Sequence, residues 1–168
     1  IWIAAPGDGL YWVDPQKPDV INGIASLNNY APAQGIFRTF VEDTEGTIWI
    51  GTASGVLLYD PRSDKISEFS TDVIRGDITG VTVDENGDVL ISTHNHLYRW
   101  SLSRKRLVRI TPEDGIWEIT HSFMDGEGLK ISIRGKGLLA LNDDGRLVQF
   151  DLKPNDRSLS RLDVSAMY

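Results

Sequence analysis

The chain has 168 residues, of which 40% are hydrophobic and 24% charged, enough apolar material for one or two ordinary domains with a core. The net charge of −7 argues against a nucleic-acid binder, because the one basic run, Arg104-Lys105-Arg106, is best interpreted as a solvated turn. The absence of cysteine excludes disulfides, thiolate nucleophiles and cysteine-ligated zinc, and no apolar run approaches the ~20 residues of a membrane-spanning helix.

Short apolar segments of strand type, separated by turn residues, follow one another along the whole chain. The first strands are expected at 1–3 and 10–13, followed by an extended outer strand and loop within 17–34 and a strand at 36–42. Further strands are expected at 48–50, 56–59, 65–69, 78–83, 89–91, 97–100, 106–110, 116–124, 129–131, 138–141 and 146–150. Alternation of apolar and polar residues between Gly, Pro, Asn and Asp indicates strands joined by turns.

An Asp-x-x-Gly turn recurs at a fixed period of 41 residues, starting at Asp43, Asp84 and Asp125. An Asp side chain can accept a hydrogen bond from the backbone two residues on, and Gly adopts the positive φ that a hairpin needs. The turn is therefore interpreted as structural. A calcium loop would need five or more oxygen ligands at set positions, and these turns offer too few, so no metal site is predicted.

Four short strands in about 41 residues, repeated four times, are the signature of β-propeller blades. The sequence thus predicts an all-β fold, a β-propeller of four-stranded antiparallel blades, as one segment over 1–168 with units at about 1–46, 47–87, 88–128 and 129–168. A β-sandwich is the alternative, but a sandwich has no reason to repeat its side chains at a fixed period. Because the chain opens without Met and four units are few for a ring, a fragment of a larger propeller is expected. Its open blade edges would favour a homodimer.

Residues 46–61 resemble the two-component-regulator propeller repeat. The positions that match it are Asp43, Gly46, Trp49, Gly51, Thr52, Gly55, Tyr59 and Asp60, and the other three units keep less of the pattern. The resemblance implies a sensor domain on the periplasmic or extracellular side of a bacterial inner-membrane regulator, such as a hybrid histidine kinase or a diguanylate cyclase. It also implies that this segment is not an enzyme and that the kinase or cyclase activity lies elsewhere in the full-length protein.

Two other functions remain open. The blade pattern is also similar to that of streptogramin-lyase-like propeller enzymes, which use a histidine and a divalent metal. In such an enzyme, His94, His96 or His121 would have to be that histidine. A third hypothesis is that the propeller is a scaffold that binds a protein partner on its face. His94 and His96 could share one side of a strand, but no third ligand is evident, and a polar turn is the favoured interpretation. No catalytic residue, metal or cofactor is predicted.

Propeller topology indicates where a ligand would bind. The loops between second and third strands share a face with the loops that lead into each inner strand, and converging loops of this kind commonly bind ligands. The candidates on that face are Asp8, Thr52, Ser54, Arg75, His94, Glu113, Arg134 and Lys136. Thr52, Arg75, His94 and Arg134 are predicted to contact the ligand, together with His121 of an inner strand. The expected partners are a small molecule such as an oligosaccharide and the rest of a larger sensor.

Overall fold

The fold was analysed in a computed structural model that describes residues 1–5, 9–24, 27, 37–69, 71–112, 117–142 and 144–150. The chain divides into two compact units, Ile1–Ile78 and Thr79–Tyr168, and each is described by itself. Regular structure in the described residues is β-structure arranged in antiparallel sheets, as the sequence predicts. Among these residues no helix is long and apolar enough to cross a membrane.

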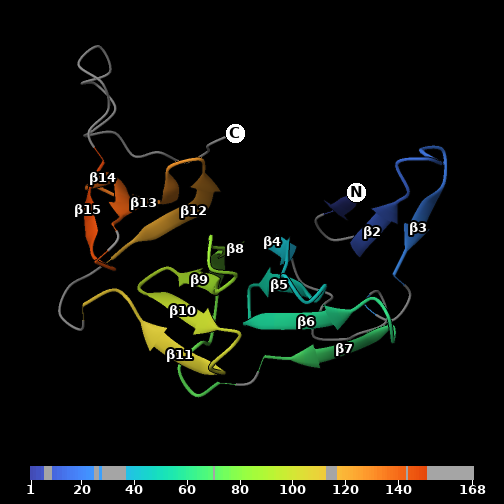
Figure 1. Ribbon diagram of the computed structural model, residues 1–168, viewed down its shortest axis with the longest axis horizontal. Coiled ribbons are helices and arrows are strands. Elements are labelled where there is room, and N and C mark those ends of the chain that lie inside the picture. Colours follow the sequence, from blue (N-terminus) through green and yellow to red (C-terminus); the bar gives the residue numbers. More distant parts are fainter. Residues whose placement is uncertain are drawn as a thin grey trace, which may run out of the picture. The chain divides into compact units, whose positions relative to one another are not determined.

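The first unit contains two sheets (Figure 1). One has three strands in the order β1-β2-β3, with the bounds β1 (Trp2–Ala5), β2 (Gly9–Val13) and β3 (Ile21–Gly23). The other has four strands in chain order, with the bounds β4 (Phe37–Glu42), β5 (Ile48–Thr52), β6 (Val56–Asp60) and β7 (Lys65–Glu68). Each strand pairs with the next one along the chain, which is the connectivity of a propeller blade.

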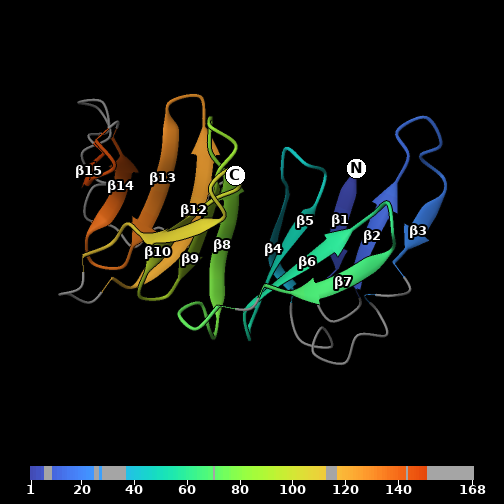
Figure 2. The ribbon, with the colours of Figure 1, turned by 60° about the horizontal axis from the view of Figure 1, so that its bottom comes forward.

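The second unit contains two four-stranded sheets with the same connectivity (Figure 2). The strands of the first are β8 (Ile78–Val83), β9 (Val89–Thr93), β10 (Leu97–Ser101) and β11 (Arg106–Arg109). The strands of the second are β12 (Ile119–Asp125), β13 (Gly128–Ile133), β14 (Gly137–Leu141) and β15 (Leu147–Gln149). The first and second strands of the three four-stranded sheets are joined by the turns that start at Asp43, Asp84 and Asp125. Each of these sheets therefore draws its first strand from the preceding sequence unit.

Burial differs between the strands of these sheets. The second strands β5 and β9 are buried along their whole length, whereas the fourth strands β7 and β11 have no buried position. A strand covered on both faces needs an almost unbroken apolar run, which β5 and β9 supply. The buried core of the first unit comprises Leu10, Ile24, Leu27, Phe37, Ile48, Ile50, Leu57 and Tyr59. That of the second comprises Leu90, Leu97, Ile119, Leu129, Ile131, Ile133 and Leu139.

The carboxylate of each repeated Asp closes its own hairpin, so its role is structural, as predicted. Asp43 accepts hydrogen bonds from the backbone amides of Glu45 and Thr47, both at 2.9 Å, and from the Trp49 indole at 2.7 Å. These bonds satisfy a carboxylate that is only 6% exposed. Asp84 and Asp125 make the same kind of turn, each accepting from the backbone amide two residues on.

The side-chain partner of this carboxylate differs in each sheet. Where the first sheet has Trp49, the second has Leu90, and the Arg99 guanidinium on the neighbouring strand pairs with Asp84 at 3.3 Å instead. In the third sheet the ammonium group of Lys130, 1% exposed, donates to Asp125 at 2.9 Å. The Asp-x-x-Gly hairpin thus recurs in the three sheets, whereas the side chain that contacts its Asp carboxylate differs.

Two details of the third blade differ from the predicted strands. The predicted strand start at 116 lies outside the described residues, and β12 begins at Ile119, with a register shift between Ile119 and His121. Its first hairpin is also tighter than the others, because Asp125 pairs directly with Gly128. The start predicted at 36 for the first inner strand likewise lies outside the described residues, and β4 begins at Phe37.

Candidate functional site

A pocket of about 410 Å³ lies in the first unit, where the β5–β6 turn meets the segment that leads into β8. Its polar lining residues are Thr52, Ser54, Thr71, Glu68 and Arg75. Its apolar lining residues are Val56, Leu57, Phe69 and Ile74. The volume falls within the range usual for small-molecule sites. An apolar wall with a few polar groups is also typical of such sites. Two predicted ligand residues, Thr52 and Arg75, thus share one pocket.

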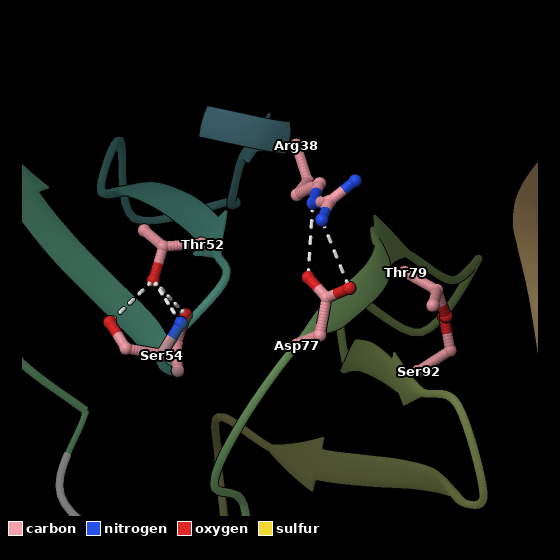
Figure 3. Close-up of polar contacts among 7 residues, drawn as sticks. Arg38, Thr52, Ser54, Asp77, Thr79 and Ser92 are labelled. Carbon is pink, nitrogen blue, oxygen red and sulfur yellow. Dashed lines mark hydrogen bonds and ion pairs between the residues drawn. The ribbon is translucent and has the colours of Figure 1, made fainter. Parts of the chain in front are cut away.

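The hydroxyl of Thr52 is engaged in building the turn (Figure 3). It donates to the Gly55 carbonyl at 2.9 Å, accepts from the Ser54 amide at 3.1 Å, and lies 3.2 Å from the Ser54 hydroxyl. Thr93, one repeat later, bonds its own turn in the same way. Since Thr52 is only 2% exposed, it shapes the turn, and the exposed Ser54 hydroxyl is the group presented to the pocket.

Arg75 brings a positive charge to the rim of the pocket. Its side chain is 78% exposed and lies 3.7 Å from the Asp72 carboxylate, a weak pairing between two solvated groups. Beside it, Ile74 is buried, and its amide donates to the Thr71 hydroxyl at 3.0 Å. On the other wall, Phe69 packs against Trp49 with ring centroids 4.9 Å apart. The rim is therefore charged and exposed, whereas the walls are held by packing.

A two-pronged ion pair in the same unit was not predicted from the sequence. Nε and Nη2 of Arg38, at the start of β4, lie 3.0 and 3.1 Å from the two carboxylate oxygens of Asp77, just before β8 (Figure 3). The equivalent of Arg38 in the next sheet, Thr79, instead bonds Ser92 on the neighbouring strand at 3.1 Å. Gly51 holds the Ser92 position in the first unit, so no side-chain hydroxyl stands there.

In the second unit, His94 and Arg134 also lie where a strand-connecting turn meets the segment leading into an inner strand. The His94 carbonyl accepts from the Ile119 amide at 2.8 Å, and the Arg134 amide donates to the Glu118 carbonyl at 2.9 Å. The guanidinium of Arg134 lies 3.6 Å from the Glu118 carboxylate. Next to it, the Lys136 ammonium stands 4.2 Å from the ring centroid of Trp117. The predicted convergence of these loops is therefore observed within each unit.

His121 lies inside the strand β12, where it pairs with Ser132, and so it is not part of these turns. Its Nδ1 is buried and has no hydrogen-bond partner among the described residues. The neighbouring inner-strand hydroxyls are paired, with Thr120 donating to Ser132 at 2.9 Å and Ser122 lying 2.9 Å from Ser92. His96, in the turn before β10, is half-buried, and burial followed by the charge of Arg109 lowers its pKa.

Three solved structures illustrate what the chain is similar to. An auxiliary nutrient binding protein from Bacteroides thetaiotaomicron aligns at a TM-score of 0.66 and 14% identity, over 88% of this chain and 37% of that one. The extracellular domain of a putative hybrid two-component system from B. thetaiotaomicron aligns at 0.57 and 24%, over 76% and 18%. Virginiamycin B lyase from Staphylococcus aureus, in an inactive variant with quinupristin, aligns at 0.64 and 10%, over 88% and 50%.

The matches also include a solved β-propeller domain. This chain has the β-propeller fold. It spans half or less of the length of the three structures above. No protein-family model matches the sequence, and no curated protein matches it.

Sequence reasoning missed the walls of the Thr52–Arg75 pocket. The sequence predicts only strand or loop structure for Glu68, Phe69 and Ile74. Their position in the chain could have indicated that they line the pocket. Glu68 ends the outer strand β7, Phe69 follows it, and Ile74 precedes β8, so both segments adjoin the predicted ligand face. Asp8 and Glu113, which were also placed on that face, lie outside the described residues.

Proposed function

We propose that this chain is the ligand-binding part of an extracytoplasmic sensor propeller in a bacterial two-component or diguanylate cyclase signalling protein. The observation that carries the proposal is the Thr52–Arg75 pocket, formed by the two kinds of loop that propeller topology brings to one face. The similarity to an extracellular two-component domain and to a nutrient binding protein supports it. So does the resemblance of residues 46–61 to the two-component-regulator repeat.

The lining of the pocket favours a small polar ligand that carries hydroxyl groups. The Ser54 hydroxyl can donate or accept, the Glu68 carboxylate accepts, and the Arg75 guanidinium donates. Phe69, half-buried between Trp49 and the pocket, offers an apolar ring to the less polar face of the ligand. An oligosaccharide fits this set, and an acidic sugar fits it best, because its carboxylate can pair with Arg75.

In this proposal the segment binds and does not catalyse. The lyase-like alternative needs a histidine beside a divalent metal. Among the described residues, no three His, Asp or Glu side chains are grouped so that they could hold a metal ion. The alternative is tested by adding Mg²⁺ or Zn²⁺ to the wild type and to the variants His94→Ala and His121→Ala. A metal-dependent rise in the unfolding temperature that either substitution abolishes would favour the enzyme.

The sensor proposal is tested by calorimetric titration of the chain with a panel of neutral and uronic-acid-containing oligosaccharides. We expect at least one acidic member to bind and Arg75→Ala to weaken that binding about ten-fold, because a charge-assisted hydrogen bond is lost. Lys17→Ala is the matched control, since it removes one exposed positive charge from another sheet of the same unit. Equal weakening in both variants, or no binding across the panel, would contradict the proposal.

A further inference from the structure

A groove of about 580 Å³ in the second unit has four arginines among its lining residues. Most of its lining comes from the β10–β11 hairpin, and Gly145 of the β14–β15 turn also contributes. The cationic lining residues are Arg99, Arg104, Arg106 and Arg109. Two serines of the hairpin, Ser101 and Ser103, add hydroxyl groups 3.3 Å apart. The proposed sensor pocket lies in the other unit, so this groove is a separate feature.

The groove has a fixed base and an open rim. Arg99 is two-thirds buried and held by Asp84, which is 9% exposed, at 3.3 Å. Arg104 and Arg106 are exposed, and neither forms an ion pair with any described residue. One carboxylate, Asp88, also lines the groove, so the arginines outnumber it. In a chain of net charge −7, this concentration of positive charge is local.

The blade repeat shows that the fold does not require these arginines. Arg104 corresponds to Ser63 and Asp144 in the sister hairpins, and Arg109 corresponds to Glu68 and Gln149. The same hairpin therefore forms with neutral or acidic residues in these places. Arg106 corresponds to Lys65 and Arg146, so its charge is shared and only its neighbours are particular to this blade. The charges of Arg104 and Arg109 are therefore not a requirement of the hairpin.

We propose that this groove binds a tetrahedral oxyanion, a phosphate or sulfate group of a ligand. Arg104 and Arg106 hold the anion, and the hydroxyls of Ser101 and Ser103 can donate hydrogen bonds to it. The planar guanidinium fork suits such oxygens, because two parallel N–H groups can bind one anion. Partial enclosure in the groove strengthens the attraction relative to a flat, fully hydrated surface. The site extends the function beyond the sensor pocket to a second, anionic ligand group.

The test is calorimetric titration of the whole chain with inorganic phosphate and inorganic sulfate, with sodium chloride keeping the ionic strength constant. We expect saturable binding of at least one dianion, weakened about ten-fold by Arg104→Gln or Arg106→Gln. Lys65→Gln is the matched control. Lys65 holds the Arg106 position in the first unit, and its substitution by Gln removes the same single positive charge. We expect it to alter affinity less than two-fold.

Two further arms identify the source of the binding. Phosphate affinity should rise between about pH 5 and pH 7.5 as its second proton leaves, while sulfate affinity stays constant. Arg106→Lys keeps the charge and loses the fork, so it should bind more tightly than Arg106→Gln and less tightly than wild type. A thermal melt of each variant confirms the fold. No saturable binding of either dianion, or equal weakening in Lys65→Gln, would overturn the proposal.

Discussion

Gly80 shows how closely the inner strands β8 and β12 approach each other in the second unit. A Cβ at this position would stand 2.1 Å from the Ser122 hydroxyl, 2.9 Å from the Ser92 hydroxyl and 3.2 Å from the Ser122 amide. The absence of a side chain at Gly80 therefore permits the Ser92–Ser122 contact at 2.9 Å. Gly80 thus has a packing role.

We expect Gly80→Ala to reduce the free energy of unfolding by about 1–3 kcal/mol, because the added methyl group forces Ser122 to move. Gly126→Ala is the control, since a Cβ there meets no atom within 4 Å. Urea denaturation of both variants measures the difference. If Gly80→Ala is as stable as Gly126→Ala, the close approach of Ser122 is not present in solution.

Lys130 illustrates a buried charge that takes the place of an indole. Its ammonium group donates to Asp125 at 2.9 Å and lies 4.9 Å from the centroid of the Phe150 ring. The hydrogen bond from Lys130 is the main cause of a lowered pKa at the Asp125 carboxyl, whose ordinary value is 3.8. Because the folded pKa lies below the unfolded one, the pairing stabilises the folded state above the unfolded pKa. That stabilisation is lost as the pH falls through the folded pKa.

We expect Lys130→Met to lose less unfolding free energy than the wild type when the pH falls from about 6 to about 2.5, because the variant has no pairing to lose. Denaturant unfolding at several pH values gives the two profiles. Lys136→Met, at an exposed lysine of the same sheet, should keep the wild-type profile. Parallel profiles for wild type and Lys130→Met would show that Asp125 is not held by Lys130.

At the scale of the element, the strands were predictable and several of their contacts were not. The alternating apolar pattern and the 41-residue turn period placed every four-stranded sheet, and loop topology placed Thr52 and Arg75 together. The Arg38–Asp77 pair escaped prediction because its two residues lie 39 positions apart and the pair does not recur in the next sheet. The register of His121 escaped because an irregularity in β12 cannot be read from periodicity.

The Arg38–Asp77 pair joins the start of one inner strand to the segment before the next inner strand. We expect a double-mutant cycle of Arg38→Ala and Asp77→Ala to give a coupling of about 0.5–1 kcal/mol, since the geometry is two-pronged but partly exposed. Salt near 1 M should remove most of it. The Arg75–Asp72 pair, far more exposed, should give no measurable coupling. Equal coupling energies for the two pairs would contradict this account.

At the scale of the whole chain, the repeat acts as an internal reference for the role of each residue. Positions where the sheets agree, such as Asp43, Asp84 and Asp125, build the hairpins. Positions where they differ are the places to look for function. Arg104 stands out by this criterion, and Arg75 stands out by lining the pocket that the converging loops form.

The central claim is that the Thr52–Arg75 pocket binds a small polar ligand. The most direct measurement is a ¹⁵N–¹H NMR titration of the chain with neutral and uronic-acid-containing oligosaccharides. We expect saturable shift changes that cluster in the β5–β6 turn and at residues 71–75, with Ser54 and Arg75 among the largest. No saturable change with any member of the panel, or changes confined to residues that do not line the pocket, would contradict the claim.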